Sequence, residues 1–510
     1  MKKKHIIIRG TIILTITGFI TRIIGFFYRI FLSRTIGAEG MGIYQLIFPI
    51  YAMCFSLTSA GIQTSISRFV AAKIATGDRR AAKDILGIGL FISVGLSAIV
   101  SFVLYLNADF IAIHILDEKR CCDLLRILAF TVPFGAIHSC INGYYYGLKK
   151  AHLPATSQLV EQLVRVGSSY LIFLFLQEKN LPVTPALAVI GIILGEFAAM
   201  LFCVTSIIGS FLKTSIPPKR TTSLKIHARN ILSLSIPLTA NRVLLNILQS
   251  VEAIMIPGKL RNFGMSVSES LSVYGVLNGM ALPLILFPSA ITNSVSVMLL
   301  PTIAEAQASG NNNLISRTIQ NTIKYCLILG IFCTGAFLMF GPDIGNRVFG
   351  NELAGTFIII LCWICPFLYL STTLNSVING LGKTSSSFFH NTIGLGIRIL
   401  FVFWGIPRYG IIGYLWGLLV SELVITFLSI FILHQYIKLS FSVYDCIVKP
   451  VFALLLSAGG TFFVQSLLLR LRGTGGILEI LILLCVLCVI YIILLFIFGS
   501  LSTNFVRRKT

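Results

Sequence analysis

Nine charged residues lie inside long apolar stretches of the sequence, where a charge is costly and usually serves a purpose. A charge near the centre of a bilayer costs about 2.5–3.5 kcal/mol on insertion scales, so such residues face protein or water rather than lipid. Residues of these types could bind an ionic substrate, carry protons or hold helices together. The nine are Arg22, Arg29, Glu161, Arg165, Glu196, Arg242, Glu252, Arg398 and Glu422.

Arg22 and Arg242 favour the binding of a phosphate group. The two arginines open the first and the seventh apolar stretches at corresponding positions, and arginine can bind phosphate with two parallel hydrogen bonds. The alternative is that each one snorkels to the membrane surface or pairs with a carboxylate such as Glu252. Arg29 follows Arg22 by two helical turns on the same face, so it could join that site or reach the outer surface.

The remaining intramembrane acids are predicted to have structural roles. Glu161 and Arg165 are four residues apart on one helix face, which predicts an ion pair, with lining of the cavity as the alternative. Glu196 and Glu422 occupy equivalent places in two halves of the chain, and we expect both to brace helix packing rather than to carry protons.

A polar stripe in the second apolar stretch extends the predicted substrate site. Gln63, Ser65 and Ser67 precede Arg68 there, and contact with lipid would not explain them. The predicted substrate-binding residues are Arg22, Arg29, Arg68, Arg242, Glu252, Ser65 and Asn293.

No pattern in the sequence predicts catalysis, a metal or a cofactor. Cys362 and Cys365 have CxxC spacing, but they lie in an apolar run and are expected to pack in the interior. No Asp-x-Asp motif and no His/Cys cluster with zinc spacing occurs, and no loop could house a catalytic domain. We therefore expect a protein that is not an enzyme and that holds no cofactor or metal.

The composition is that of an integral membrane protein. Of the 510 residues, 56% are hydrophobic and 11% are charged, whereas soluble domains have about 25% charged residues. Mean hydropathy is +0.91. The formal net charge of +22 arises mostly from short loops between apolar runs, where basic residues set topology and meet anionic lipid. Nucleic-acid binding is therefore not expected.

Runs of about twenty apolar residues predict fourteen transmembrane helices. The first is read as an uncleaved span rather than a signal peptide. Basic residues are concentrated on one side of the alternating loops, which places both termini in the cytoplasm. The predicted spans are 11–33, 43–68, 85–106, 124–147, 157–177, 186–210, 230–256, 271–299, 320–341, 356–381, 388–406, 411–433, 446–468 and 476–499.

An internal repeat predicts two six-helix halves. Ile141-Asn142-Gly143 matches Ile378-Asn379-Gly380, Arg165 matches Arg398, and Asp109 matches Asp343, all in one order. Six spans are an even number, so both halves insert in the same orientation, as in transporters with a substrate site between halves. The predicted domains are an N-terminal lobe at 1–212, a basic linker at 213–229, a C-terminal lobe at 230–437 and a helix pair at 438–510.

The opening stretch from Gly18 to Tyr44, with Arg22, Arg29 and Arg34, resembles the multidrug/oligosaccharidyl-lipid/polysaccharide flippase superfamily. Within it, the chain is similar to the stage V sporulation protein B group of polysaccharide-biosynthesis proteins, relatives of the lipid II flippase. The resemblance implies two lobes that alternate between inward-open and outward-open states, a cationic cavity that includes Arg22 and Arg34, and a lipid-tail groove at the terminal helix pair. The lipid II flippase has an Arg-Asp pair where this chain has Tyr28-Arg29, so the substrate stays open.

The function expected from these observations is transport of an undecaprenyl-linked anionic glycolipid, such as lipid II or a related oligosaccharide, across the cytoplasmic membrane. It would serve cell-wall or spore-cortex peptidoglycan. Its partners would be the polyprenyl-pyrophosphate-linked glycan and membrane lipid, and we expect a monomer. The alternative is a multidrug/cation antiporter of the same superfamily. Such pumps typically have twelve helices and an acid in the N-terminal half, whereas the expected cavity charges here are basic.

Overall fold

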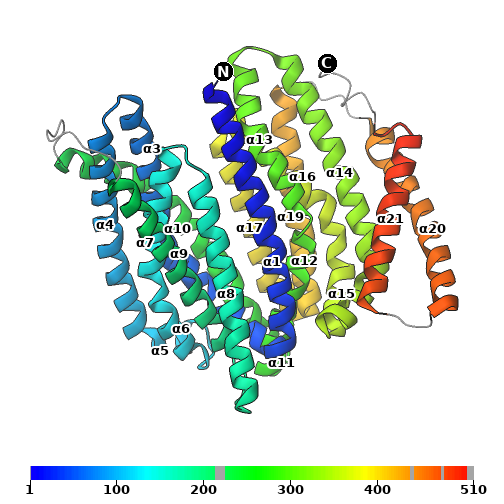
Figure 1. Ribbon diagram of the computed structural model, residues 1–510. Coiled ribbons are helices and arrows are strands. Elements are labelled where there is room, and N and C mark those ends of the chain that lie inside the picture. Colours follow the sequence, from blue (N-terminus) through cyan, green and yellow to red (C-terminus); the bar gives the residue numbers. More distant parts are fainter. Residues whose placement is uncertain (1, 213–223, 437–441, 473–475, 502–510) are drawn as a thin grey trace. The chain divides into compact units, whose positions relative to one another are not determined.

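The computed structural model describes residues 2–212, 224–436, 442–472 and 476–501, which form helices and contain no strand (Figure 1). This confirms the prediction of an all-α membrane protein. Contacts divide the chain into two compact units. Unit 1 comprises Met1–Arg261 and Ser266–Gly275, and unit 2 comprises Asn262–Met265 and Val276–Thr510.

Unit 1 contains eleven α-helices and two π-helices among its described residues. The elements are α1 (Lys2–Leu46), α2 (Phe48–Phe55), η1 (Ser56–Ala60), α3 (Gly61–Ala75), α4 (Arg79–Leu106), α5 (Ala108–Phe110), η2 (Ile111–Ile115), α6 (Cys121–Ala129), α7 (Thr131–Gly147), α8 (His152–Glu178), α9 (Ala186–Leu212), α10 (Leu224–Asn262) and α11 (Val267–Gly275).

Unit 2 contains the remaining helices. Its described elements are η3 (Val276–Ala281), α12 (Leu282–Leu286), α13 (Ser289–Ala308), α14 (Asn312–Asp343), η4 (Ile344–Phe349), α15 (Glu352–Leu361), η5 (Cys362–Ile364), α16 (Cys365–Gly380), α17 (Thr384–Trp404), α18 (Ile406–Tyr409), α19 (Ile411–Tyr436), η6 (Tyr444–Val448), α20 (Lys449–Arg472) and α21 (Ile477–Ile497).

Twelve helices in the described segments are long and apolar enough to cross a membrane, and the pair α6–α7, bent by 40°, raises the number to thirteen. The predicted count of fourteen is not confirmed. The predicted span 43–68 and all but the first two residues of 11–33 fall within one helical run, Ile13–Ala75, of 63 residues. At about 1.5 Å per residue, this run is about three times as long as the ~30 Å hydrocarbon core is thick.

Gly37 interrupts that long helical run. Its backbone has φ of 70° and ψ of −178°, a conformation that side chains rarely permit and glycine adopts freely. The π-helix η1 adds a second irregularity, between α2 and α3. Such π-segments are frequent at functional sites. The residues before and after Gly37 therefore form separately directed helices.

The interior of unit 1 is built from the apolar faces of α3, α4, α7 and α9. Ile66 and Val70 of α3 pack in one buried cluster with Ile85 of α4, Tyr145 of α7 and Cys203 of α9. Gly143 and Gly147 of α7 allow the backbones of α3 and α7 to approach closely, because a methyl group on Gly143 would lie 2.6 Å from the carbonyl oxygen of Gln63. This packing fixes the helices that carry the polar residues described below.

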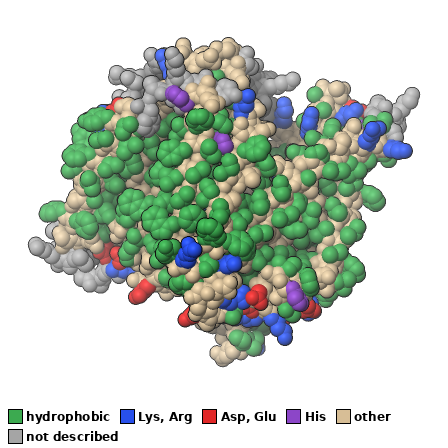
Figure 2. Space-filling model, turned by 180° about the vertical axis from the view of Figure 1, so that it is seen from behind, with side chains coloured by type: hydrophobic (Ala, Val, Ile, Leu, Met, Phe, Trp, Pro, Cys, Tyr) green, Lys and Arg blue, Asp and Glu red, His purple; other side chains and the backbone are tan. Residues whose placement is uncertain are grey.

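Unit 2 places its terminal helix pair against α14. The Tyr491 hydroxyl of α21 donates to the Ile328 carbonyl at 3.1 Å, and α20 and α21 lie side by side (Figure 1). Hydrophobic side chains cover most of the face in Figure 2, where charged side chains are few. That distribution suits a surface in contact with lipid.

The helix order of the two units repeats locally. Asp109 lies just before the π-helix η2, and its predicted match Asp343 lies just before the π-helix η4. Both π-helices follow a long spanning helix, α4 or α14. The predicted domain boundaries stay a prediction. They are drawn from the internal repeat, whereas the two units are defined by contacts, which group α10 and α11 with unit 1. Most of the predicted linker 213–229 lies outside the described residues.

Candidate functional site

Three of the predicted substrate-binding arginines are exposed on unit 1. Arg22 lies on α1, Arg68 on α3 and Arg242 on α10. Among the residues that the structure describes, none of the three forms a salt bridge or a side-chain hydrogen bond. Each belongs to a helix long and apolar enough to span a membrane. An unpaired guanidinium in such a helix needs water or an anion beside it.

The other predicted residues lie in different surroundings. Arg29 is half-buried, and Glu252 and Ser65 are buried. The Ser65 hydroxyl has no hydrogen-bond partner among the described residues. Asn293 is half-buried on α13 of unit 2, where its amide donates to the Ser289 hydroxyl at 3.4 Å. The predicted set is therefore divided between the two units. Only Arg22, Arg68 and Arg242 have the same surroundings, because all three are exposed and form no salt bridge among the described residues.

The predicted ion pair between Glu161 and Arg165 is confirmed. The two side chains pair on α8, where they are 17% and 20% exposed. The carboxyl of Glu196 on α9 accepts a hydrogen bond from the Tyr51 hydroxyl at 3.2 Å. Its counterpart Glu422 on α19 accepts from Ser371 at 2.9 Å. Both acids link helices, as predicted.

His138 is a site residue that the sequence analysis did not identify. It lies on α7, and its Nδ1 is 3.2 Å from Glu196 Oε2. The ligand atoms of His138, Glu161 and Glu196 lie within 4.8 Å of one another, the one group in the described residues that could hold a metal ion. The signal available in the sequence was a histidine inside the apolar run 124–147. The sequence position alone does not predict which acids His138 contacts.

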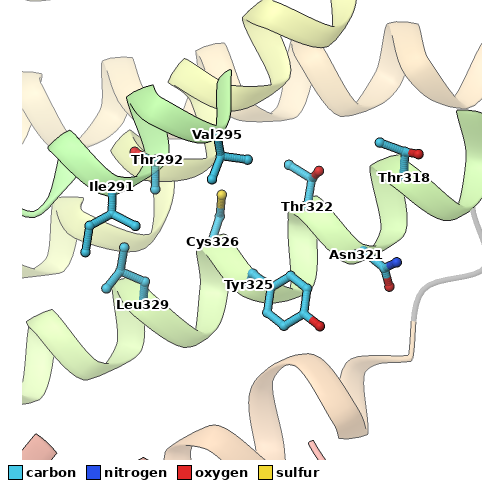
Figure 3. Close-up of a pocket in the computed structure, with 9 residues that line it drawn as sticks. All are labelled: Ile291, Thr292, Val295, Thr318, Asn321, Thr322, Tyr325, Cys326 and Leu329. Carbon is cyan, nitrogen blue, oxygen red and sulfur yellow. The ribbon is translucent and has the colours of Figure 1, made fainter. Parts of the chain in front are cut away.

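A pocket of about 410 Å³ lies between α13 and α14 in unit 2 (Figure 3). Ile291, Val295 and Leu329 contribute apolar side chains. Thr318 and Asn321 are at the end of the pocket away from Ile291 and Leu329. The volume falls in the range of small-molecule sites, roughly 300–1,000 Å³. The pocket can accept an apolar chain with a polar group at one end.

Cysteine chemistry has no place in this arrangement. The twelve cysteines are all free, and Cys362 and Cys365 are fully buried at η5 and the start of α16. The expectation that this CxxC segment packs in the interior is confirmed.

Comparison with known proteins agrees with these features. Residues 7–307 match the family described as Polysaccharide biosynthesis protein, and residues 263–404 match the MatE family. Stage V sporulation protein B of Bacillus subtilis (strain 168) is 26% identical over 438 residues, which cover 83% of each chain. Lipid II flippase MurJ of the same organism is 24% identical, over 77% of this chain and 76% of its own.

Solved structures share the fold. Lipid II flippase MurJ in an inward closed conformation superposes with a TM-score of 0.73 at 15% identity, covering 97% of this chain and 100% of the other. An inward-facing multidrug resistance MATE family transporter gives a TM-score of 0.64 at 15% identity, covering 82% of this chain and 94% of the other. These relatives are flippases and transporters rather than enzymes. The chain belongs to the polysaccharide biosynthesis protein family, multi-pass membrane proteins of the multidrug/oligosaccharidyl-lipid/polysaccharide flippase superfamily.

Proposed function

We propose that this protein is a flippase that moves a polyprenyl-pyrophosphate-linked glycan across the cytoplasmic membrane by alternating access. The substrate would be lipid II or a related lipid-linked oligosaccharide, used for cell-wall or spore-cortex peptidoglycan. The protein would act as a monomer in membrane lipid, with both termini in the cytoplasm. The family match over residues 7–307 supports this class of function.

The observation that carries the proposal is the contrast between paired and unpaired arginines. Arg165, in the interior of unit 1, is neutralised by Glu161. Arg22, Arg68 and Arg242 are exposed and lack a salt bridge among the described residues. A guanidinium left unpaired in a spanning helix suits a transient anionic partner, and a pyrophosphate group offers several oxygens to it. A cation substrate would not be attracted to these charges.

The pocket between α13 and α14 supports a substrate with an apolar chain. Its lining is mainly apolar, and Ile291 and Val295 are exposed at 53% and 43%, so a lipid could reach them. Burial of each CH₂ group contributes about 0.8 kcal/mol. A polyprenyl chain entering this pocket would add affinity that a free sugar phosphate lacks.

Flipping in proteoliposomes tests the proposal. A fluorescent polyprenyl-pyrophosphate glycan should move between leaflets, as measured by its accessibility to a membrane-impermeant quencher. Arg22→Ala should abolish the movement, and Arg22→Lys should restore part of it, because a point charge cannot form two parallel bonds. Arg229→Ala, an exposed arginine at the start of α10, is the control and should move substrate normally. Full activity in Arg22→Ala would contradict the assigned role.

A second candidate is cation-coupled drug export, favoured by the MatE match at residues 263–404. In the same proteoliposomes, a cationic dye driven by a proton gradient would accumulate if this function were correct. Movement of the glycan without dye uptake supports the flippase, and the reverse result supports the drug pump.

A further inference from the structure

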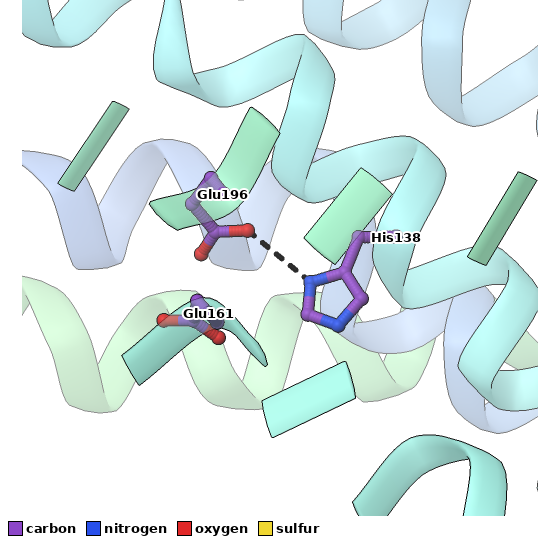
Figure 4. A group of neighbouring side chains, drawn as sticks. All are labelled: His138, Glu161 and Glu196. Atoms are coloured by element: carbon purple, nitrogen blue, oxygen red, sulfur yellow. Dashed lines mark hydrogen bonds and ion pairs between the residues drawn. The ribbon is translucent and has the colours of Figure 1, made fainter. Parts of the chain in front are cut away.

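A polar cluster that includes His138, Glu161 and Glu196 lies in the interior of unit 1 (Figure 4). His138 comes from α7, Glu161 and Arg165 from α8, and Glu196 from α9. The side chains of His138 and Glu196 are only 9% and 8% exposed. Three consecutive helices thus bring two acids, one arginine and one histidine together.

The hydrogen bonds around His138 place a proton on its Nδ1 and allow a second one on its Nε2. Its Nδ1 faces Glu196 at 3.2 Å, and an ionised carboxylate can only accept. Its Nε2 lies 3.0 Å from the Ser157 hydroxyl, which can donate to the Pro154 carbonyl at 3.0 Å and accepts from the Asn142 side-chain amide at 3.2 Å. Two states satisfy these bonds. In one, Ser157 donates to Nε2 of a neutral ring; in the other, Ser157 donates to Pro154 and both nitrogens of a charged, doubly protonated ring donate.

The charge balance of the cluster favours the doubly protonated ring. Glu161 and Glu196 contribute two negative charges, and Arg165 contributes one positive charge. With a neutral His138, a net negative charge would remain in a buried site, which is unfavourable. One proton on His138 makes the set neutral.

The second half of the chain provides an internal comparison. Arg398 and Glu422 repeat Arg165 and Glu196, and they pair at 3.4 Å. At the positions that the repeat aligns with Glu161 and His138, the second half has Gly394 and Asn375. One arginine and one glutamate are already neutral there. Neither the extra acid nor the histidine is present at the aligned positions of the second half, where the buried His390 of α17 bonds to Ser429 at 3.4 Å and to no acid among the described residues.

The cluster is connected to the irregular segment that contains α2 and η1. The Tyr51 hydroxyl of α2 donates to Glu196 Oε1 at 3.2 Å. Asn246 of α10 donates to the Ser56 hydroxyl at 2.6 Å and to the Ala52 carbonyl at 3.2 Å. Helix α2 is therefore hydrogen-bonded to the cluster through Tyr51 and to α10 through the Ala52 carbonyl. A change of charge at Glu196 or His138 acts directly on the first of these attachments.

We propose that His138, Glu161, Arg165 and Glu196 form a proton-binding site in the interior of unit 1, with His138 as the group that takes up the proton. The proton occupies the ring nitrogen that neutral His138 leaves free, and its release to water leaves the cluster with one negative charge. Glu161 of α8, paired with Arg165, and Glu196 of α9 lie close to His138, and Tyr51 of α2 is bonded to Glu196. No described side chain of α3, α4 or α6 forms a hydrogen bond or ion pair with His138.

Nitrogen NMR of the full-length protein in lipid nanodiscs tests the site without any substrate. The chain has seven histidines, and His138-Ser139 is its one His-Ser pair. Histidine labelled with carbon-13 and nitrogen-15, combined with nitrogen-15-labelled serine, therefore identifies His138 without a mutation. At neutral pH both of its ring nitrogens should be protonated, and raising the pH should remove one proton. A neutral His138 in the wild-type protein at neutral pH would overturn the proposal.

Variants separate the charge balance from a merely structural role. Glu161→Gln removes one negative charge and should leave His138 neutral at the same pH. Glu422→Gln, at the acid of the second half that matches Glu196, is the control and should leave His138 charged. A charged His138 in folded Glu161→Gln would refute the charge balance. Adding Na⁺ or Zn²⁺ to the wild-type protein should not change the His138 spectrum, whereas displacement of the proton by either ion would make this a metal site instead.

Hydrogen–deuterium exchange tests whether the cluster stabilises α2. Tyr51→Phe removes the bond to Glu196 but changes no charge, so His138 should stay protonated while the amides of Phe48–Phe55 exchange faster with deuterium. His138→Gln should also speed exchange in α2. Unchanged exchange in Tyr51→Phe would show that the cluster does not hold α2. None of these measurements depends on flipping, so they can fail or succeed independently of the proposed function.

Discussion

Gly275 of α11 lies directly against Gly42 of α1. A methyl group on Gly275 would be 3.0 Å from the Cα atom of Gly42, and one on Gly42 would be 2.7 Å from the carbonyl carbon of Leu271. Small residues allow two membrane helices to approach to backbone contact. The predicted topology places this contact at the outer face of the membrane, where a transporter would close its outer mouth.

Gly42→Ala should therefore separate α1 from α11. The added methyl group meets backbone atoms, which cannot move aside as a flexible side chain can. Leu271, which is 2% exposed, should become accessible. The measurement is labelling of Leu271→Cys by a membrane-impermeant maleimide in a background without native cysteines. Gly18→Ala, on the same helix with no atom within 4 Å of its added methyl, should leave Leu271→Cys protected. Equal labelling in both variants would mean that this contact does not close the outer face.

Cysteine labelling from the two sides of the membrane can decide whether the bent pair α6–α7 crosses the bilayer. Lys119 precedes this pair and Lys150 follows it, and both are exposed. If the pair spans the membrane, cysteines at the two positions will be labelled from opposite sides. Glu118 would be a poor probe because it is 7% exposed. Labelling of both positions from one side would mean that the pair re-enters, and the count of spans would stay at twelve.

Gly195→Ala should destabilise unit 1. The new methyl group would lie 2.8 Å from the Glu161 carbonyl oxygen and 3.1 Å from Arg165 Cβ, so α8 and α9 would be pushed apart. Overpacking of this kind costs about 1–3 kcal/mol, which exceeds the ~1 kcal/mol that alanine gains over glycine in a helix. Thermal unfolding in detergent should show a lower midpoint. Gly209→Ala, on the same helix with free space around it, should unfold at the wild-type temperature or above. A stable Gly195→Ala would mean that the two helices can readjust.

The loop after η2 should become looser at acidic pH. Arg120 pairs with Glu118 at 2.8 Å and with Glu39 of α1 at 2.6 Å. Burial alone would raise the pKa of the Glu118 carboxyl, but the hydrogen bonds and charge of Arg120 outweigh it and hold the pKa below 4.5. A lowered folded-state pKa means that the stabilisation is complete above 4.5 and is lost as the pH falls through the folded value.

Arg120→Ala should accordingly lower the unfolding temperature at neutral pH. The loss should be modest, about 1 kcal/mol or less, because the Arg120 side chain is 50% exposed and water screens the pair. The difference from wild type should shrink as the pH falls below 4.5. Lys119→Ala, an exposed neighbour, should match the wild-type protein throughout. A difference that persists at acidic pH would assign the effect to packing rather than to charge.

The apolar runs and the i, i+4 spacing of Glu161 and Arg165 were sufficient to predict much of this protein. A bilayer imposes both a length and a composition on each span, and both can be read directly along the chain. The ion pair is local to one helix, so its partners meet whatever the rest of the fold does. The match of Arg165 to Arg398 and of Glu196 to Glu422 likewise needed only the order of residues in the repeat.

Contacts between helices could not be obtained in that way. Hydropathy determines that a helix is in the membrane but not which of its faces meets which neighbour, since lipid and apolar side chains are equally good surroundings. Only the tertiary structure brought His138 beside Glu196, placed Gly42 against Gly275, and grouped α10 and α11 with unit 1. The sequence alone determined that the chain is a helical membrane protein with charges in its spans, and the packing of helices decided which of those charges neutralise one another and which stay exposed.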